Sequence, residues 1–197
     1  MKMPRRLPLA LAATLLPLVA QAHPGHPGHD LEWDFTAGLA HPLSGLDHLL
    51  AMVAVGLWAA QLGGRARWLV PSAFVTMMAL GAALARTGLV LPGVEPFIAA
   101  SVLILGLLIG TAARLPVSAG MALVGVFALS HGFAHGAEMP GTTGVPSYGA
   151  GFIFATILLH AAGLGLGALA ARSASVRATN YAGWAIAACG AVMIATG

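Results

Sequence analysis

Two short stretches hold most of the side chains in this sequence that could do chemistry. The first is HPLSGLDH, residues 41–48, which runs directly into the apolar LLAMVAVGLWAAQL. The second is HGFAHGAE, residues 131–138, late in another apolar segment. An ionisable side chain in hydrocarbon costs free energy, roughly 2.5–3.5 kcal/mol for Asp on insertion scales, so it persists mainly where it pairs, lines a wet cavity or holds an ion. We therefore predict that the two stretches form one metal site.

In the first stretch the predicted helix presents two imidazoles on one face. Pro42 suits the first helical position, which leaves His41 as a hinge-like residue at the outer end. At about 100° per residue, His41 and His48 fall within roughly 20° of each other around the helix. Asp47 points somewhat aside, so it is either a third ligand or an acceptor that orients a histidine.

The second stretch carries the same kinds of side chain on one face of its helix. His131, His135 and Glu138 stand at i, i+4 and i+7, and histidines at i and i+4 are a familiar chelating pair. His131 and His48 each lie about six residues, roughly 9 Å, from the same predicted membrane surface. The two stretches are therefore expected at matching depth.

Two other histidine positions have open interpretations. His160 stands alone in an apolar segment, where it either hydrogen-bonds a neighbouring helix or serves as a deeper ligand or proton acceptor. His23 begins HPGHPGHDLEWD, which is either a flexible metal-capturing segment or a solvated tail. The methionines are interpreted as packing residues, among them Met52, Met77 and Met78.

Composition places the chain in a membrane. It is 58% hydrophobic and 8% charged, with a mean hydropathy of +0.88, whereas soluble domains carry about 25% charged residues. The net charge of +3 does not indicate nucleic-acid binding, because three of the nine bases lie in residues 1–22, and 9 − 3 = 6 bases then balance six acids. The single cysteine, Cys189, excludes an internal disulfide and a multi-thiolate metal centre, so the candidate ligands are nitrogen and oxygen donors.

The elements that must position these residues are predicted to be membrane helices. Residues 1–22 read as a cleaved signal peptide, with Lys2, Arg5 and Arg6 before an apolar run and Ala20-Gln21-Ala22 at its end. Residues 23–36 form a His-rich segment on the outer side, and residues 37–197 form the transmembrane domain. The predicted fold is an all-α membrane protein, a bundle of six transmembrane helices, at about 42–62, 68–85, 96–113, 117–137, 148–171 and 180–197.

Basic residues indicate how the bundle is oriented. With the mature N-terminus outside, the cytoplasmic connections carry five arginines: Arg65, Arg67, Arg114, Arg172 and Arg177. The outer connections carry only Arg86, together with Glu95 and Glu138. This bias obeys the positive-inside rule and predicts a multi-pass protein of the bacterial inner membrane.

The two motifs also resemble those of a known family. H-x5-D-H followed by LLAM, together with H-G-x-A-H-G-x-E, is similar to the HupE/UreJ family over essentially the whole mature chain. The resemblance implies a secondary permease for nickel, in some members cobalt, that supplies hydrogenases or ureases and is not an enzyme. It also implies that the partners are a divalent metal ion and the lipid bilayer and that the protein needs no cofactor. A homo-oligomer is possible on this interpretation. The matching residues are His41, Asp47, His48, His131, His135 and Glu138, whereas His23 and His160 lie outside the motifs and inherit no role.

Other functions stay open at this point. Imidazole and carboxylate donors suit divalent nickel, cobalt, zinc or iron, and spacing does not choose among them. A membrane-embedded zinc hydrolase, a b-type cytochrome, and a metal sensor or donor without transport are the alternatives. Ligation needs neutral imidazoles, so uptake should weaken as the pH falls below about 6.5. Uptake that is unchanged between about pH 7.5 and 5.5 would count against histidine ligation.

Overall fold

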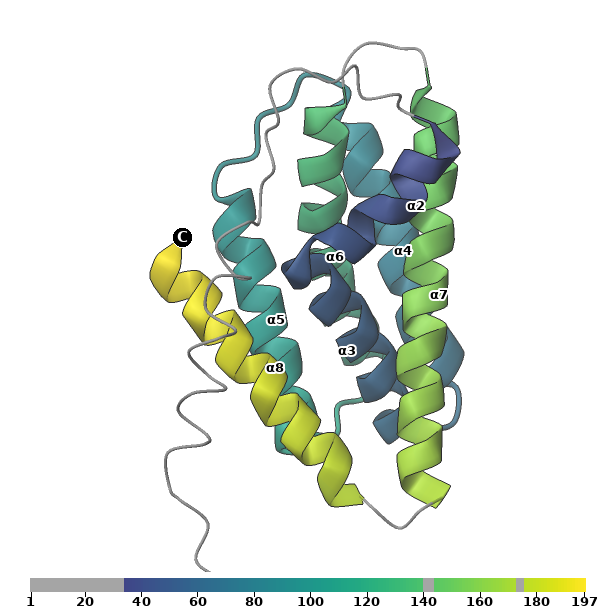
Figure 1. The fold of residues 1–197 in the computed structure, drawn as a ribbon, viewed down its shortest axis with the longest axis vertical. Helices are drawn as coiled ribbons and strands as arrows, with labels where there is room; N and C mark the ends of the chain where they lie inside the picture. Colours follow the sequence, from purple (N-terminus) through teal and green to yellow (C-terminus); the bar gives the residue numbers. More distant parts are fainter. Residues whose placement is uncertain (1–33, 140–143, 173–175) are drawn as a thin grey trace, which may run out of the picture. The chain divides into compact units, whose positions relative to one another are not determined.

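The computed structural model describes residues 34–139, 144–172 and 176–197. The predicted signal peptide and His23 lie outside the described residues. The chain divides into residues 1–30 and residues 31–197, and only the second unit is considered below. Every element described in it is an α-helix (Figure 1). The helices are α2 (Phe35–Ser44), α3 (Leu46–Leu62), α4 (Ala66–Ala85), α5 (Val94–Gly110), α6 (Val117–Glu138), α7 (Val145–Arg172) and α8 (Val176–Thr196).

The helices have the length and composition of membrane spans. Four of them, α4, α6, α7 and α8, are long and apolar enough to cross a bilayer. α2 and α3 pass the same test as a pair that is bent by 85°, which brings the number to as many as five. α5 is apolar but has only 17 residues. The all-α membrane fold is thus confirmed, and the sixth span stays a prediction.

The predicted continuous first helix is wrong, because the chain breaks at Gly45. α2 begins at Phe35, where the Asp34 carboxylate accepts a hydrogen bond from the backbone N–H of Ala37 at 2.8 Å. This hydrogen bond lowers the pKa of Asp34. Pro42 lies inside α2 instead of at a helix start. The ring of Pro42 crowds the turn before it and removes one N–H from the helix; Gly45, with φ −93° and ψ 120°, separates α2 from α3.

Close helix contacts hold the centre of the bundle together. α3 packs along α7, and α4 packs along α6. At Gly56 of α3 a Cβ would collide with the backbone carbonyl of His160 in α7, and at Gly132 of α6 it would collide with that of Met78 in α4. Small residues let membrane helices approach this closely. α5 and α8 pack on each other (Figure 1).

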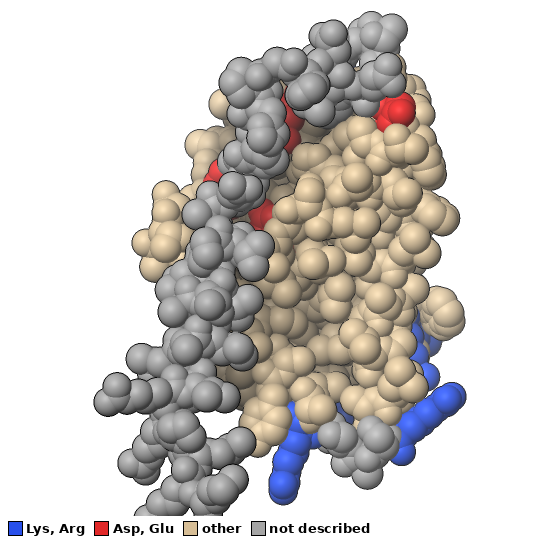
Figure 2. Space-filling view, viewed as in Figure 1, with Lys and Arg blue, Asp and Glu red and all other residues tan. Residues whose placement is uncertain are grey.

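Charged side chains gather at the two ends of this helical unit, and Arg86 is an arginine that lies at the acidic end, next to Met139. The five arginines of the predicted cytoplasmic side lie at or next to the α3–α4, α5–α6 and α7–α8 connections. Figure 2 shows blue side chains at that end and red ones at the other. The acidic end holds the start of α2 and the last residue of α6, Asp34 and Glu138. The segregation of basic from acidic residues that the sequence predicted is therefore present in the fold.

Candidate metal site

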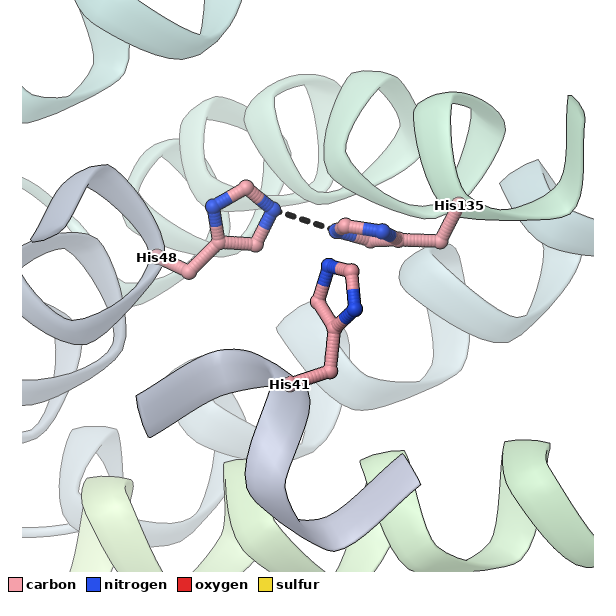
Figure 3. Close-up of side chains that lie close together, drawn as sticks. All are labelled: His41, His48 and His135. Atoms are coloured by element: carbon pink, nitrogen blue, oxygen red, sulfur yellow. Dashed lines mark hydrogen bonds between the residues drawn. The ribbon is translucent and has the colours of Figure 1, made fainter. Parts of the chain in front are cut away.

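Three imidazoles from three helices meet at the acidic end of the bundle. His41 comes from α2, His48 from the first turn of α3 and His135 from the last turn of α6. Each offers one ring nitrogen, and these nitrogens all lie within 4.8 Å of one another (Figure 3). Nε2 of His48 contacts Nε2 of His135. We call these three residues the outer trio; they show that the two predicted stretches do come together.

The bend between α2 and α3 creates this arrangement. In one uninterrupted helix, residues seven apart are separated by about 10 Å along the axis. With the bend, the ring centroids of His41 and His48 lie 6.0 Å apart, and those of His41 and His135 lie 4.6 Å apart. A Cβ on Gly45 would lie 2.8 Å from Oδ1 of Asp47 and 3.2 Å from Nδ1 of His48. Glycine at the break therefore leaves the space that these two side chains occupy.

Asp47 lies against the ring of His48. Its Oδ1 accepts the backbone N–H of His48 at 2.8 Å and lies 2.6 Å from Nδ1 of the same residue. Both side chains are buried. The contact at Nδ1 does not have the geometry of a hydrogen bond. Nε2 of His48 faces His135, so Asp47 lies beside the ring and outside the set of three ring nitrogens that meet.

His131 lies next to the outer trio without belonging to it. Its ring centroid is 5.1 Å from that of His48, and its Nε2 is 3.0 Å from Oγ of Ser101. The Ser101 hydroxyl donates to the carbonyl of Ile98 at 2.7 Å. The serine oxygen must then accept from His131 Nε2–H, since a hydroxyl has a single proton. This assignment places the lone pair of His131 on Nδ1, which has no hydrogen-bond partner among residues 34–139, 144–172 and 176–197.

The remaining predicted residues are farther from the trio. Oε2 of Glu138 is 3.7 Å from Nδ1 of His135, and its side chain is 44% exposed, so this is a loose contact. His160 is buried in α7 with its ring centroid 5.1 Å from that of Phe74. Neither of its ring nitrogens has a hydrogen-bond partner within the described ranges.

Two aromatic side chains of α7 that pack against the trio were not predicted from the sequence. The Phe152 ring lies 4.6 Å from the His135 ring, 5.9 Å from the His41 ring and 6.5 Å from the His48 ring, measured between centroids. Tyr148 lies 6.0 Å from His41. Counting back from His160 in steps of four reaches Thr156, Phe152 and Tyr148, so the helical repeat could have found them. These rings close the trio on the side of α7.

The chemistry of the trio suits a divalent transition-metal ion. Neutral imidazoles are good ligands for nickel, cobalt, zinc and copper, whereas magnesium and calcium prefer oxygen. His135 also stands in the last turn of α6, where the partial negative charge of the helix end favours cations. These features define a multi-pass helical membrane protein with an imidazole cluster near one end.

Comparisons with known proteins identify the family. Residues 11–193 match the family described as HupE / UreJ protein. The chain is 46% identical over 190 residues to Protein HupE of Rhizobium leguminosarum bv. viciae. This alignment covers 96% of this chain and 97% of that protein. No solved structure matches. The chain belongs to the HupE/UreJ family, as its two histidine motifs predicted.

Proposed function

We propose that this protein is a secondary transporter that moves divalent nickel, with cobalt as a second substrate, across the bacterial inner membrane. The observation that carries the proposal is the outer trio, three imidazoles from separate helices within 4.8 Å in an apolar bundle of this family. The ion is then the substrate. The protein is not an enzyme and uses no resident cofactor. Its partners are the metal ion and the lipid bilayer.

We place the trio on the extracytoplasmic side. The supporting observation is that five arginines lie at the opposite end of the helical unit, and cytoplasmic connections are enriched in Lys and Arg. The acidic side chains at the trio end attract cations to it. In this orientation α5 is the sixth span, and the mature N-terminus lies outside.

Capture at the trio is an exchange of ligands. A hydrated Ni²⁺ ion exchanges water molecules for His41, His48 and His135, while the Asp47 carboxylate stays beside the ring of His48. His41 is the half-buried member of the trio and stands on the short helix α2. Movement of α2 relative to α3 would therefore change the number of imidazoles around the ion. We propose that this change releases the ion inward.

Nickel influx into proteoliposomes tests the proposal. The purified wild type should give saturable Ni²⁺ influx, and His48→Ala should reduce influx to the level of protein-free vesicles. Met77→Leu is a matched control, because Met77 is a half-buried side chain of α4 outside the trio; it should keep wild-type influx. A wild type that binds Ni²⁺ but gives no influx would overturn transport and favour a sensor or donor.

The same three imidazoles favour one alternative, a membrane-embedded zinc hydrolase. Catalytic zinc is held by three protein ligands with a fourth position left for water, and three histidines can supply that set. Zinc that survives dialysis, together with an absence of metal influx, would support the hydrolase instead. Metal influx that depends on His48 would exclude it as the main activity.

A further inference from the structure

We propose a second metal-binding site one helical turn deeper than the outer trio, made by Met52, Met78, Thr156 and His160. We call it the inner site. It takes the Ni²⁺ ion after the ion leaves the trio, and in this respect it rests on the proposed function. Both methionines, which the sequence analysis interpreted as packing residues, would then be ligands.

Three potential metal ligands from three helices lie close together: the hydroxyl of Thr156 and the sulfur atoms of Met52 and Met78. Oγ1 of Thr156 lies 3.4 Å from Sδ of Met52 in α3 and 3.8 Å from Sδ of Met78 in α4. It also lies 2.9 Å from the carbonyl of Phe152, the best acceptor of the three for the single hydroxyl proton. The lone pairs of Oγ1 are then available beside the two sulfurs. All three donor side chains are at most 2% exposed.

His160 supplies the fourth donor. It stands four residues after Thr156 on the same face of α7 and is only 2% exposed. A neutral imidazole carries one donor and one acceptor nitrogen, and burying both without a partner costs free energy. In the part of the chain that the structure describes, neither ring nitrogen has a hydrogen-bond partner. Coordination of an ion through one nitrogen would offset part of that cost.

The inner site is continuous with the trio through buried side chains. Met52 follows His48 by one turn on α3, and Thr156 follows Phe152 by one turn on α7. The ring of Phe152 already contacts the trio. An ion leaving His48 therefore meets the faces of α3 and α7 that carry the next two donors.

A second line of contacts links the same two levels. The ring of His131 lies 5.1 Å from that of His48, and the ring of Phe74 lies 5.8 Å from His131 and 5.1 Å from His160. His131 and Phe74 are fully buried. The contacts thus form one connected column from the trio to His160.

The donor set determines what the inner site would hold. Thioether and imidazole are softer donors than carboxylate, so the site favours transition-metal ions over magnesium and calcium, which need oxygen ligands; the choice of nickel rests on the proposed function. Its donors are neutral, and thioether sulfur is a weak ligand for a divalent ion. A weaker site after a stronger one suits conduction, because the ion must be able to leave.

Leucine substitution separates ligation from packing. Leucine is close to methionine in volume and is well tolerated at buried methionine positions, but it has no sulfur. Met52→Leu/Met78→Leu is compared with Met77→Leu/Met193→Leu, which changes two half-buried methionines outside the column. For the inner-site variant we expect about tenfold slower Ni²⁺ influx into proteoliposomes, with Ni²⁺ affinity at the trio unchanged and the control pair within about twofold of wild type.

His160→Gln provides a second variant that leaves the methionines in place. It should slow Ni²⁺ influx in the same way and leave binding at the trio intact. Wild-type influx in both inner-site variants would overturn the proposal. Loss of Ni²⁺ binding at the trio in both would also overturn it, since these residues would then act through packing.

X-ray absorption at the nickel edge tests the site without transport. Cys189→Ala removes the single thiol, so that methionine is the remaining protein sulfur. With two equivalents of Ni²⁺, this protein should show a sulfur ligand that disappears in its Met52→Leu/Met78→Leu derivative. Nitrogen and oxygen ligands alone would overturn the inner site and leave the proposed function standing. Absent wild-type influx would overturn the function, and the sulfur signal would still decide whether the inner site exists.

Discussion

The outer trio and the proposed inner site share only helix α3, which contributes His48 to one and Met52 to the other, and they use different donors. The trio joins three imidazoles, one of them 2.6 Å from a buried carboxylate oxygen. The proposed inner site joins two thioethers, a hydroxyl and one imidazole, and none of its four donors is a carboxylate. In the proposed mechanism the stronger donors capture the ion and the weaker donors, one helical turn deeper, release it.

The two sites also differ in their backbone. The trio stands at a helix break and at a helix end, where α2 contributes His41 from a ten-residue helix. The inner site stands in mid-helix, and close glycine contacts brace the carbonyls of two of its members, His160 and Met78. A movement of α2 would change the trio without changing the inner site. Rearrangement is therefore expected first at the outer end.

Removing an imidazole of the trio should give the largest effect. His48→Ala and His135→Ala should each weaken Ni²⁺ binding by about 100-fold or more, since a direct ligand matters at least as much as an outer-shell partner. Because the two side chains share one ion, the double variant should lose much less than the sum of the single losses. Isothermal titration of the purified protein measures all three affinities, and additive losses would show that the histidines bind separate ions.

Asp47→Asn should have the next largest effect, and it sharpens the contrast between the two sites. The amide removes the negative charge that lies 2.6 Å from Nδ1 of His48, so Ni²⁺ affinity should fall by on the order of 10- to 100-fold. Influx at saturating Ni²⁺ should change little, because the inner site is untouched. Glu95→Gln removes an exposed carboxylate of α5 and serves as the control for lost charge. If Glu95→Gln lowered Ni²⁺ affinity equally, Asp47 would act only through the net negative charge of the protein.

Gly45→Ala should have an intermediate effect at the helix break. The new Cβ would press on Asp47 and His48 at 2.8 and 3.2 Å. Forcing side chains off their rotamers costs about 0.5–1.5 kcal/mol, which corresponds to roughly twofold to tenfold weaker binding. Gly149→Ala is the matched control, since no atom would lie within 4 Å of its Cβ. Ni²⁺ titration that finds the two variants equal would remove Gly45 from the positioning of the trio.

Glu138→Gln should have the smallest effect. Its carboxylate lies 3.7 Å from His135 and is 44% exposed, and exposed ion pairs contribute little. Ni²⁺ affinity should stay within about twofold of wild type. If Glu138→Gln lowered Ni²⁺ affinity as much as Asp47→Asn, Glu138 would be a direct ligand of the ion.

The sequence predicted the main parts of this protein for clear physical reasons. Histidines and acids are costly in hydrocarbon, so their presence at His48 and His135 predicted a shared site. Apolar runs predicted α4, α6 and α7 to within a few residues, and the arginine bias predicted which connections share an end. The resemblance of the two histidine motifs to those of a known family predicted the family, which the comparisons confirm.

Only the tertiary structure decided how these parts are used. Periodicity treats residues 42–62 as one helix, and the chain instead breaks at Gly45, where the backbone is extended. The place of Phe152 against the imidazoles, and of Met52 and Met78 beside Thr156, depends on which helix faces which. A residue's type and spacing determine what it can bind, but the neighbours that share the ion come from other helices, and packing alone selects them.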